Sequence, residues 1–475
     1  MSIAQSADLS APRPLAASAR WALASLSLTM LMSALGTSIA NVGLPTLMHA
    51  FAASFEDVQW VVLAYLLAIT TLIVSVGRLG DQFGRRRLLL TGLLLFTLAS
   101  LLCAFAPTLP VLILARGAQG LGGAIMMALT LAFVGEAVPK EKTGSAMGLL
   151  GTTSAIGTAL GPSLGGILID LFGWPALFLV NVPLGLVAVL LVGRHLPADR
   201  GSSPARPGRF DLPGTLLLAL TLAAYALALT LGRGHPGVLN AALLATALAG
   251  GVLFVLAESR VASPLIRLAL FRNPQLSGGF ASSALVTTIV MATLVVGPFY
   301  LTAAFALDAA GVGLVMSTGP IVAALTGFPA GRLVDRFGAD RMVVAALVVM
   351  VVGTALLAAL PAQWGIAGYV VPLLLVTGGY AAFQTANNTG VMKDVALDQR
   401  GLVSALLNLS RNLGLITGAS LMGAVFALGS TLGNGSGTPA SAAQSGLHLT
   451  FACATALVVL ALVVTLACRA AARRH

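Results

Sequence analysis

Charged residues are scarce in this chain. Only 9% of its 475 residues are Asp, Glu, Lys or Arg, whereas soluble domains carry about 25%. With 58% of the residues hydrophobic, a water-soluble fold would have to expose large apolar patches and would aggregate. The composition therefore predicts a protein whose surface faces mostly lipid.

Cysteines and clusters of metal-ligating side chains are also few. Cys103, Cys453 and Cys468 lie in apolar runs and form no CxxC pair, so they imply neither a disulfide framework nor a metal. No cluster of His, Asp and Glu suits acid–base or metal chemistry, which argues against a membrane-embedded enzyme and predicts no cofactor. No charge ring or filter-like repeat indicates a channel.

Long apolar runs make up most of the chain. A membrane-spanning helix needs about 20 mostly apolar residues. Fourteen runs qualify: 22–48, 57–76, 88–106, 109–133, 144–171, 174–193, 212–231, 238–257, 276–300, 310–330, 341–360, 365–390, 401–428 and 448–468. They are predicted to be helices, because backbone groups in lipid need partners within their own segment. Residues 1–19 lack the order of a signal peptide, so the first run is expected to remain as an anchor.

The basic residues predict the orientation of these spans. With the N-terminus inside, 23 of the 26 Lys and Arg residues fall on the cytoplasmic side, two (Arg116 and Arg411) lie in spans and Arg233 lies outside. The opposite orientation would scatter the charges over both sides. Both termini are therefore predicted to be cytoplasmic, in the inner membrane of a bacterium. The net charge of +11 is spread over short loops, so nucleic acid is not an expected partner.

A repeated loop divides the chain into two similar parts. Residues 77–87 and 331–341 both begin with G-R-L-x-D-x-F-G and are 254 positions apart, after the second and the tenth span. With a repeat unit of six spans, residues 1–195 form one six-helix bundle and residues 261–475 form another. Residues 196–260 then supply a linker, rich in Pro, Gly, Ser and Arg, and an inserted pair of spans.

Two six-span halves with this loop after the second span of each resemble the major facilitator superfamily. The inserted pair resembles its 14-span drug:proton antiporter branch. The resemblance implies an all-α membrane fold of two six-helix bundles plus the pair, working as a monomer in membrane lipid. It also implies export of small amphipathic compounds in exchange for protons by alternating access. The alternative is a proton-independent exporter, or a facilitator of a neutral or anionic metabolite.

The repeated loop resembles motif A of that family. Its glycines Gly77 and Gly84 allow a tight turn, and Asp81 can accept hydrogen bonds from a helix N-terminus or an arginine. With Arg85, and with Asp335 of the second copy, these residues are predicted to form a latch that closes one side of the carrier. The simpler alternative is a basic loop that only fixes topology.

Two further motifs lie inside spans. Residues 114–122 resemble motif B, in which the family assigns the arginine, here Arg116, to proton or conformational coupling; the alternative is an arginine that reaches the outer surface. Gly148, Gly157, Gly161-Pro162 and Gly165-Gly166 match the spacing of the antiporter motif C, which resembles exporters. Gly157, Gly161, Pro162 and Gly165 are therefore expected to take part in gating, or merely to form a small-residue packing face.

The first span departs from the family pattern. Gly36 stands where the family usually has an aspartate tied to cation recognition or proton coupling, and no Asp or Glu lies at the middle of a predicted span. A proton-coupled carrier needs a group that is protonated alternately from the two sides. The remaining candidates are Asp81, Glu136 and Asp170, and the alternative for each is a plain helix-end or loop residue.

Polar residues near the middle of several spans predict a substrate site. Gln384, Asn387 and Asn388 are spaced to share one helix face, as are Asn408, Arg411 and Asn412. Together with Asn41, Tyr65 and Gln119 they are expected to bind substrate in a central cavity. The alternative is ordinary interhelical hydrogen bonding, or interface anchoring for Tyr65. Cations without a nearby carboxylate favour neutral or anionic amphipathic ligands.

Overall fold

The computed structural model is helical throughout its regular structure. It describes residues 17–73, 75–137, 143–197, 211–231, 237–260, 268–359, 361–393, 395, 400–433 and 438–472. The N-terminal half (residues 17–197) comprises α1 Ala17–Val42, α2 Leu44–Phe51, α3 Phe55–Leu72, α4 Val76–Phe83, α5 Arg85–Ala104, α6 Leu109–Ala137, α7 Thr143–Phe172, α8 Ala176–Leu179 and α9 Asn181–His195.

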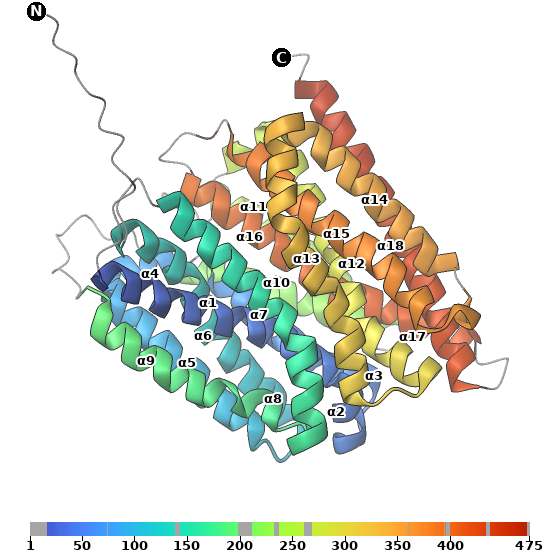
Figure 1. The fold of residues 1–475 in the computed structure, drawn as a ribbon. Coiled ribbons are helices and arrows are strands. Elements are labelled where there is room, and N and C mark those ends of the chain that lie inside the picture. Colours follow the sequence, from blue (N-terminus) through green and yellow to red (C-terminus); the bar gives the residue numbers. More distant parts are fainter. Residues whose placement is uncertain are drawn as a thin grey trace, which may run out of the picture.

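The inserted pair and the C-terminal half follow. The pair is α10 Leu212–Thr230 and α11 Val238–Arg260. The C-terminal half (residues 268–472) comprises η2 Leu268–Arg272, α12 Pro274–Phe305, α13 Ala309–Phe337, α14 Ala339–Ala359, η3 Ala362–Trp364, α15 Gly365–Met392, α16 Arg400–Thr417, the π-helix η4 Gly418–Met422, α17 Gly423–Gly433 and α18 Pro439–Ala472. In Figure 1 the blue-to-green helices of the N-terminal half lie on one side and the orange-to-red helices of the C-terminal half on the other.

Thirteen segments of the described chain are long and apolar enough to cross a membrane. They correspond to thirteen of the fourteen predicted spans. The remaining one, predicted at 144–171, lies in α7, where only Ile156–Phe172 forms a shorter apolar helix. Helix α7 as a whole spans 30 residues and carries the glycines of motif C. The all-helical membrane architecture is thus confirmed, whereas the count of fourteen stays a prediction.

The backbone repeats its turns at the spacing found in the sequence. Gly84 (φ 90°) precedes α5 and Gly338 (φ 85°), 254 residues later, precedes α14. Ala52 (φ 47°) and Ala306 (φ 52°), again 254 residues apart, end α2 and α12 in the left-handed region, which is unfavourable for alanine. The side of the bundle with the first pair of turns is called the Gly84 end below, and the side with the second pair the Ala52 end.

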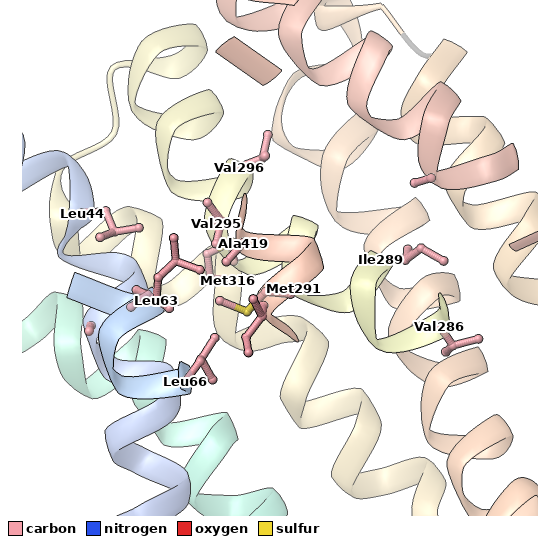
Figure 2. Close-up of a cluster of buried hydrophobic side chains, with 14 of the residues drawn as sticks. Leu44, Leu63, Leu66, Val286, Ile289, Met291, Val295, Val296, Met316 and Ala419 are labelled. Atoms are coloured by element: carbon pink, nitrogen blue, oxygen red, sulfur yellow. The ribbon is translucent and has the colours of Figure 1, made fainter. Parts of the chain in front are cut away.

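Two apolar clusters hold the helices together. One lies wholly within the N-terminal half, and the other draws residues from both halves. Figure 2 shows Leu63 and Leu66 of α3 close to Met291 and Val295 of α12 and to Ala419 of η4. The two halves are therefore packed against each other through apolar side chains, without a covalent or ionic tie at this place.

Helix α10 of the inserted pair contacts both halves. Its Thr215 and Thr230 hydrogen-bond to Ser75 (3.0 Å) and to the indole nitrogen of Trp60 (3.2 Å) in the N-terminal half. Its Tyr225 hydroxyl donates to Thr417 Oγ1, just before the π-helix, at 3.3 Å. The indole nitrogen of Trp60 therefore ties α3 to the inserted pair.

Candidate functional site

Arg116 lies at the centre of a buried polar network in the N-terminal half. The residue is 0% exposed, and its guanidinium donates to three acceptors on three helices: Val61 O of α3 (2.8 Å), Gln119 Oε1 of α6 (2.5 Å) and Gly36 O of α1 (3.1 Å). The guanidinium carbon also lies 4.2 Å from the centre of the Tyr65 ring, a cation–π contact. Arg116 therefore does not extend to the surface, but holds α1, α3 and α6 in one arrangement.

Two residues that the sequence predicts to bind substrate belong to the same buried network. Gln119 is 0% exposed and donates from Nε2 to Ser100 Oγ of α5 at 2.7 Å. Tyr65 is also 0% exposed and donates to Ser33 O of α1 at 3.0 Å. Neither side chain offers a surface to a ligand in this conformation, because both are 0% exposed and their polar atoms are used within the protein. Their arrangement fits the interhelical alternative.

Asn41 is buried as well. Its amide nitrogen donates to Thr37 O and Ser38 O of its own helix, both at 3.1 Å, while its amide oxygen is buried without a hydrogen-bond partner. An unsatisfied acceptor at this depth is unfavourable and leaves room for a donor from a bound molecule or a moving helix. Asn41 thus remains a candidate for contact with substrate.

Gly36 leaves no room for the aspartate of the family pattern. A Cβ atom at this position would lie 3.0 Å from both Tyr65 Oη and Phe96 Cζ, tighter than most real contacts. The acceptors around Arg116 are consequently two backbone carbonyls and an amide, all of them neutral. The buried guanidinium has no carboxylate partner among the described residues, which is unusual for an arginine at this depth.

The small residues of motif C pack against two different helices. A Cβ at Gly157 would lie 2.6 Å from Leu31 O, and one at Gly165 would lie 2.7 Å from Val42 Cγ1, so this row, with Gly161, packs on α1. Pro162 and Gly166 instead face α13 of the other half: a Cβ at Gly313 would lie 2.4 Å from Pro162 O. Helix α7 is therefore wedged between α1 and α13, and both faces require residues without side chains.

Three sets of contacts join the halves at the Ala52 end, and we call them the seal. The first is α7 on α13, where Asp170 Oδ2 accepts from Ala310 N at 3.2 Å and Gly166 packs on Ala309. The second is the amide of Gln59, which lies directly on Gly423 and leaves no space for a side chain there. The third is an aromatic group in which Phe55 meets Phe299 (4.5 Å between ring centres) and Phe426 (5.7 Å).

Most of the seal escaped the sequence reasoning. Gly166 lies four residues after Pro162 and so on the same helix face, which is a signal that could have found it. Gly313, Gly423 and Phe299 carry no such signal, because glycines and phenylalanines are common throughout this chain. The sequence presents Asp170 either as a proton carrier or as a plain helix-end residue, whereas the structure gives it a backbone partner in the other half.

The motif A residues lie at the Gly84 end. Gly77 and Asp81 belong to α4, but their surroundings lie outside the part of the chain that can be described. Gly84 forms the turn between α4 and α5, and Arg85 opens α5. Asp335 is exposed on α13 and has no hydrogen bond or ion pair with any described residue. The proposed latch therefore stays a prediction.

The polar residues of α15 do not form one wall. Asn387 is buried and donates to Gly279 O of α12 at 3.2 Å, beside a cavity of about 40 Å³ that the Asp340–Arg469 ion pair also lines. Asn388 is exposed. Gln384 faces Arg411 of α16, so the three side chains have different neighbours, and their joint role in binding substrate stays a prediction. The three positions spread over about 100° of the helix circumference, which is wide enough for their neighbours to differ.

Gln384 meets Arg411 of α16. With its oxygen turned toward the guanidinium, the Gln384 amide lies 3.0–3.2 Å from all three nitrogens of Arg411. The Tyr380 hydroxyl is 3.2 Å from the same amide group. Tyr380, Gln384, Arg411 and Asn408 are all half-buried. Unlike the Arg116 network, this group remains accessible to a ligand.

The sequence profile described as "Major Facilitator Superfamily" matches residues 26–419 of the chain. The chain belongs to the major facilitator superfamily. The family resemblance drawn from the loop repeat is thereby confirmed.

Three curated proteins illustrate the range of relatives. The uncharacterized transporter YebQ of Escherichia coli is 34% identical over 392 residues, covering 82% of this chain and 85% of that protein. The riboflavin transporter RibZ of Clostridioides difficile is 33% identical over 83% of this chain and 86% of its own length. The multidrug resistance protein Stp of Mycobacterium tuberculosis is 34% identical over 85% of this chain and 75% of its own length.

Solved structures agree on the fold. A bacterial homologue of the human lysosomal transporter Spinster, in an inward-facing conformation, superposes with a TM-score of 0.70 at 14% identity, covering 96% of this chain and 98% of that one. Relatives and structural neighbours alike are transporters, so this family member is a multi-pass membrane transporter and not an enzyme. Multidrug resistance proteins among the relatives support the predicted kinship with the efflux type.

Proposed function

We propose that this transporter exports small amphipathic compounds by alternating access, in exchange for protons. The observation that carries the proposal is the seal. Its contacts close the Ala52 end with glycines, backbone atoms and rings that make no covalent or ionic tie. Such a surface can separate and re-form as two rigid halves rock about a central site. The conformation described is then the one closed to the outside.

The arrangement in the membrane belongs to the same proposal. We take α7 as a further span, which brings the total to fourteen. Residues 1–195 and 261–475 are proposed to form the two bundles, with both termini cytoplasmic. The Ala52 end then faces outward and the Gly84 end, with its arginine-rich loops, faces the cytoplasm, as the positive-inside rule requires. The protein is proposed to act as a monomer in the inner membrane.

This orientation predicts which cysteines can be labelled from outside. We expect His49→Cys, exposed at the Ala52 end, to react with a membrane-impermeant maleimide in intact cells. Arg272→Cys, exposed at the other end, should react only after the membrane is permeabilised. The experiment uses a background in which Cys453 and Cys468 are serine. The opposite labelling pattern would show that the proposed topology is inverted.

Proton exchange predicts a dependence on the pH gradient. In liposomes containing the purified protein, a gradient that is acidic on the outer, Ala52 side should drive export of amphipathic dyes against their concentration gradient. Collapse of the gradient with a protonophore should abolish this accumulation while the protein remains intact. Liposomes with the opposite gradient, acidic on the inner side, serve as the matched control. Equal transport with and without the gradient would contradict antiport.

A second candidate is an exporter or facilitator that does not couple to protons. It is favoured by the surroundings of Arg116, whose acceptors Val61 O, Gly36 O and Gln119 are neutral and cannot titrate. A relative described as a riboflavin transporter supports a metabolite as cargo, and relatives described as multidrug resistance proteins support drugs. The liposome experiment above separates the two candidates, since only antiport requires the gradient.

A further inference from the structure

The guanidinium of Arg411 is contacted on one face by Gln384, and this contact leaves the N–H groups along its edges without an acceptor among the described residues. The Gln384 oxygen lies 3.0, 3.1 and 3.2 Å from the three nitrogens. A guanidinium is planar, and an oxygen in its plane can approach at most two of the three nitrogens. Nearly equal distances to all three place the oxygen above the central carbon. Gln384 therefore covers a face of Arg411, while the N–H bonds point outward in the plane.

No other described residue takes up those N–H groups. Arg411 forms no further hydrogen bond or ion pair with the described chain, whereas Arg116 uses three acceptors on three helices. Asn408, one turn earlier on α16, is half-buried and uncharged. The guanidinium of Arg411 is thus positioned by a neutral amide but is not neutralised.

Its depth makes an unbalanced charge unfavourable. Arg411 is eleven residues into α16, which starts at Arg400, so it lies about 16 Å along the helix at 1.5 Å per residue. A cation near the bilayer centre normally pairs with an anion or lines a functional path. The side chain is half-buried and therefore reachable, unlike the 0% exposed Arg116.

We infer that Arg411 binds the anionic group of the transported compound through its free N–H edges, and that the cargo is an amphipathic organic anion such as a carboxylate or sulfonate. The planar fork of arginine matches the two oxygens of such a group, and the resulting hydrogen bonds are charge-assisted. Gln384 and Tyr380 act as positioning residues that fix the plane of the fork. This inference names the substrate class of the export function proposed above and rests on it.

Three probes with the same ring system test the inference: 1-naphthaleneacetate, 2-(1-naphthyl)ethanol and 1-naphthylmethylammonium. Their binding to the purified full-length protein is measured by calorimetry at neutral pH, where the first is ionised. We expect the acid to bind about tenfold more tightly than the alcohol, and the ammonium compound to bind most weakly. An acid that binds no better than the alcohol, or not at all, overturns the inference.

Variants assign the preference to Arg411. R411Q should bring the acid to the affinity of the alcohol, and R411K, which keeps the charge but loses the fork, should retain part of the difference. R272Q removes one exposed positive charge from η2 and should change nothing. A preference for the acid that persists in R411Q overturns the assignment. If the acid binds as expected but is not moved in the liposome experiment, export fails while the anion site stands.

Discussion

Replacing Arg116 with glutamine is expected to abolish transport while the protein stays in the membrane. The guanidinium joins α1, α3 and α6 through three hydrogen bonds, and glutamine is too short to reach all three acceptors. Each buried partner left without its bond costs about 1–3 kcal/mol. We expect a lower thermal stability and, because the network fixes the three helices, loss of the coordinated movement of the N-terminal half. The loss of transport is measured with a panel of fluorescent amphipathic compounds taken up into inside-out vesicles.

Lysine at the same position separates charge from geometry. R116K keeps the positive charge, but a single ammonium cannot span acceptors on three helices, so transport should still fall strongly. R272Q, which changes an exposed arginine, is the control for altered charge and should transport at the wild-type rate. Normal transport by both Arg116 variants, at equal amounts of membrane protein, would show that the network is only structural.

Replacing Gly166 with valine is expected to abolish transport by holding the Ala52 end open. A Cβ at Gly166 would lie 2.3 Å from Ala309 O and 3.1 Å from Ala309 C. Both are backbone atoms of the other half and cannot swing aside, so α7 and α13 must separate. If the seal closes the outside, the variant will favour the outward-open state. A cysteine at Phe426, which is 7% exposed within the seal, should then react much faster with an impermeant maleimide in intact cells.

Gly251 supplies the matched control for this substitution. It also lies within a helix, α11, but a Cβ there would meet nothing within 4 Å. G251V should therefore leave transport and the labelling of the Phe426 cysteine unchanged. If G166V transports normally, or if its seal cysteine remains as protected as in the wild type, the contact between α7 and α13 is not the gate.

The internal repeat was the most informative feature of the sequence. The eight-position loop match predicted two similar halves, and the glycine that ends each copy adopts a positive φ at the same spacing. The positive φ of these glycines is a local property, because a tight turn between two apolar helices needs glycine. The sequence can therefore predict it directly. Ala52 and Ala306 also repeat, both in the left-handed region, but an alanine in the sequence does not predict a left-handed backbone.

The substrate residues show where sequence reasoning stopped. Tyr65, Gln119, Gln384 and Arg411 were grouped because all are polar residues in apolar spans. In the structure the first two lie inside the N-terminal half around Arg116, while the last two face each other between α15 and α16. Hydropathy gives the depth of a residue but not the direction in which its side chain points, and direction separates a packing contact from an accessible site.

The sequence by itself determined that this protein is a helical membrane transporter, since lipid allows little else for so many apolar runs and short motifs carry the family resemblance. Only the tertiary structure decided which groups touch. It buried Arg116 among neutral acceptors, filled the place beside Gly36 with Tyr65 and Phe96, and left the edges of Arg411 open. These outcomes depend on how distant helices rotate and approach, and no single helix encodes the position of its neighbours.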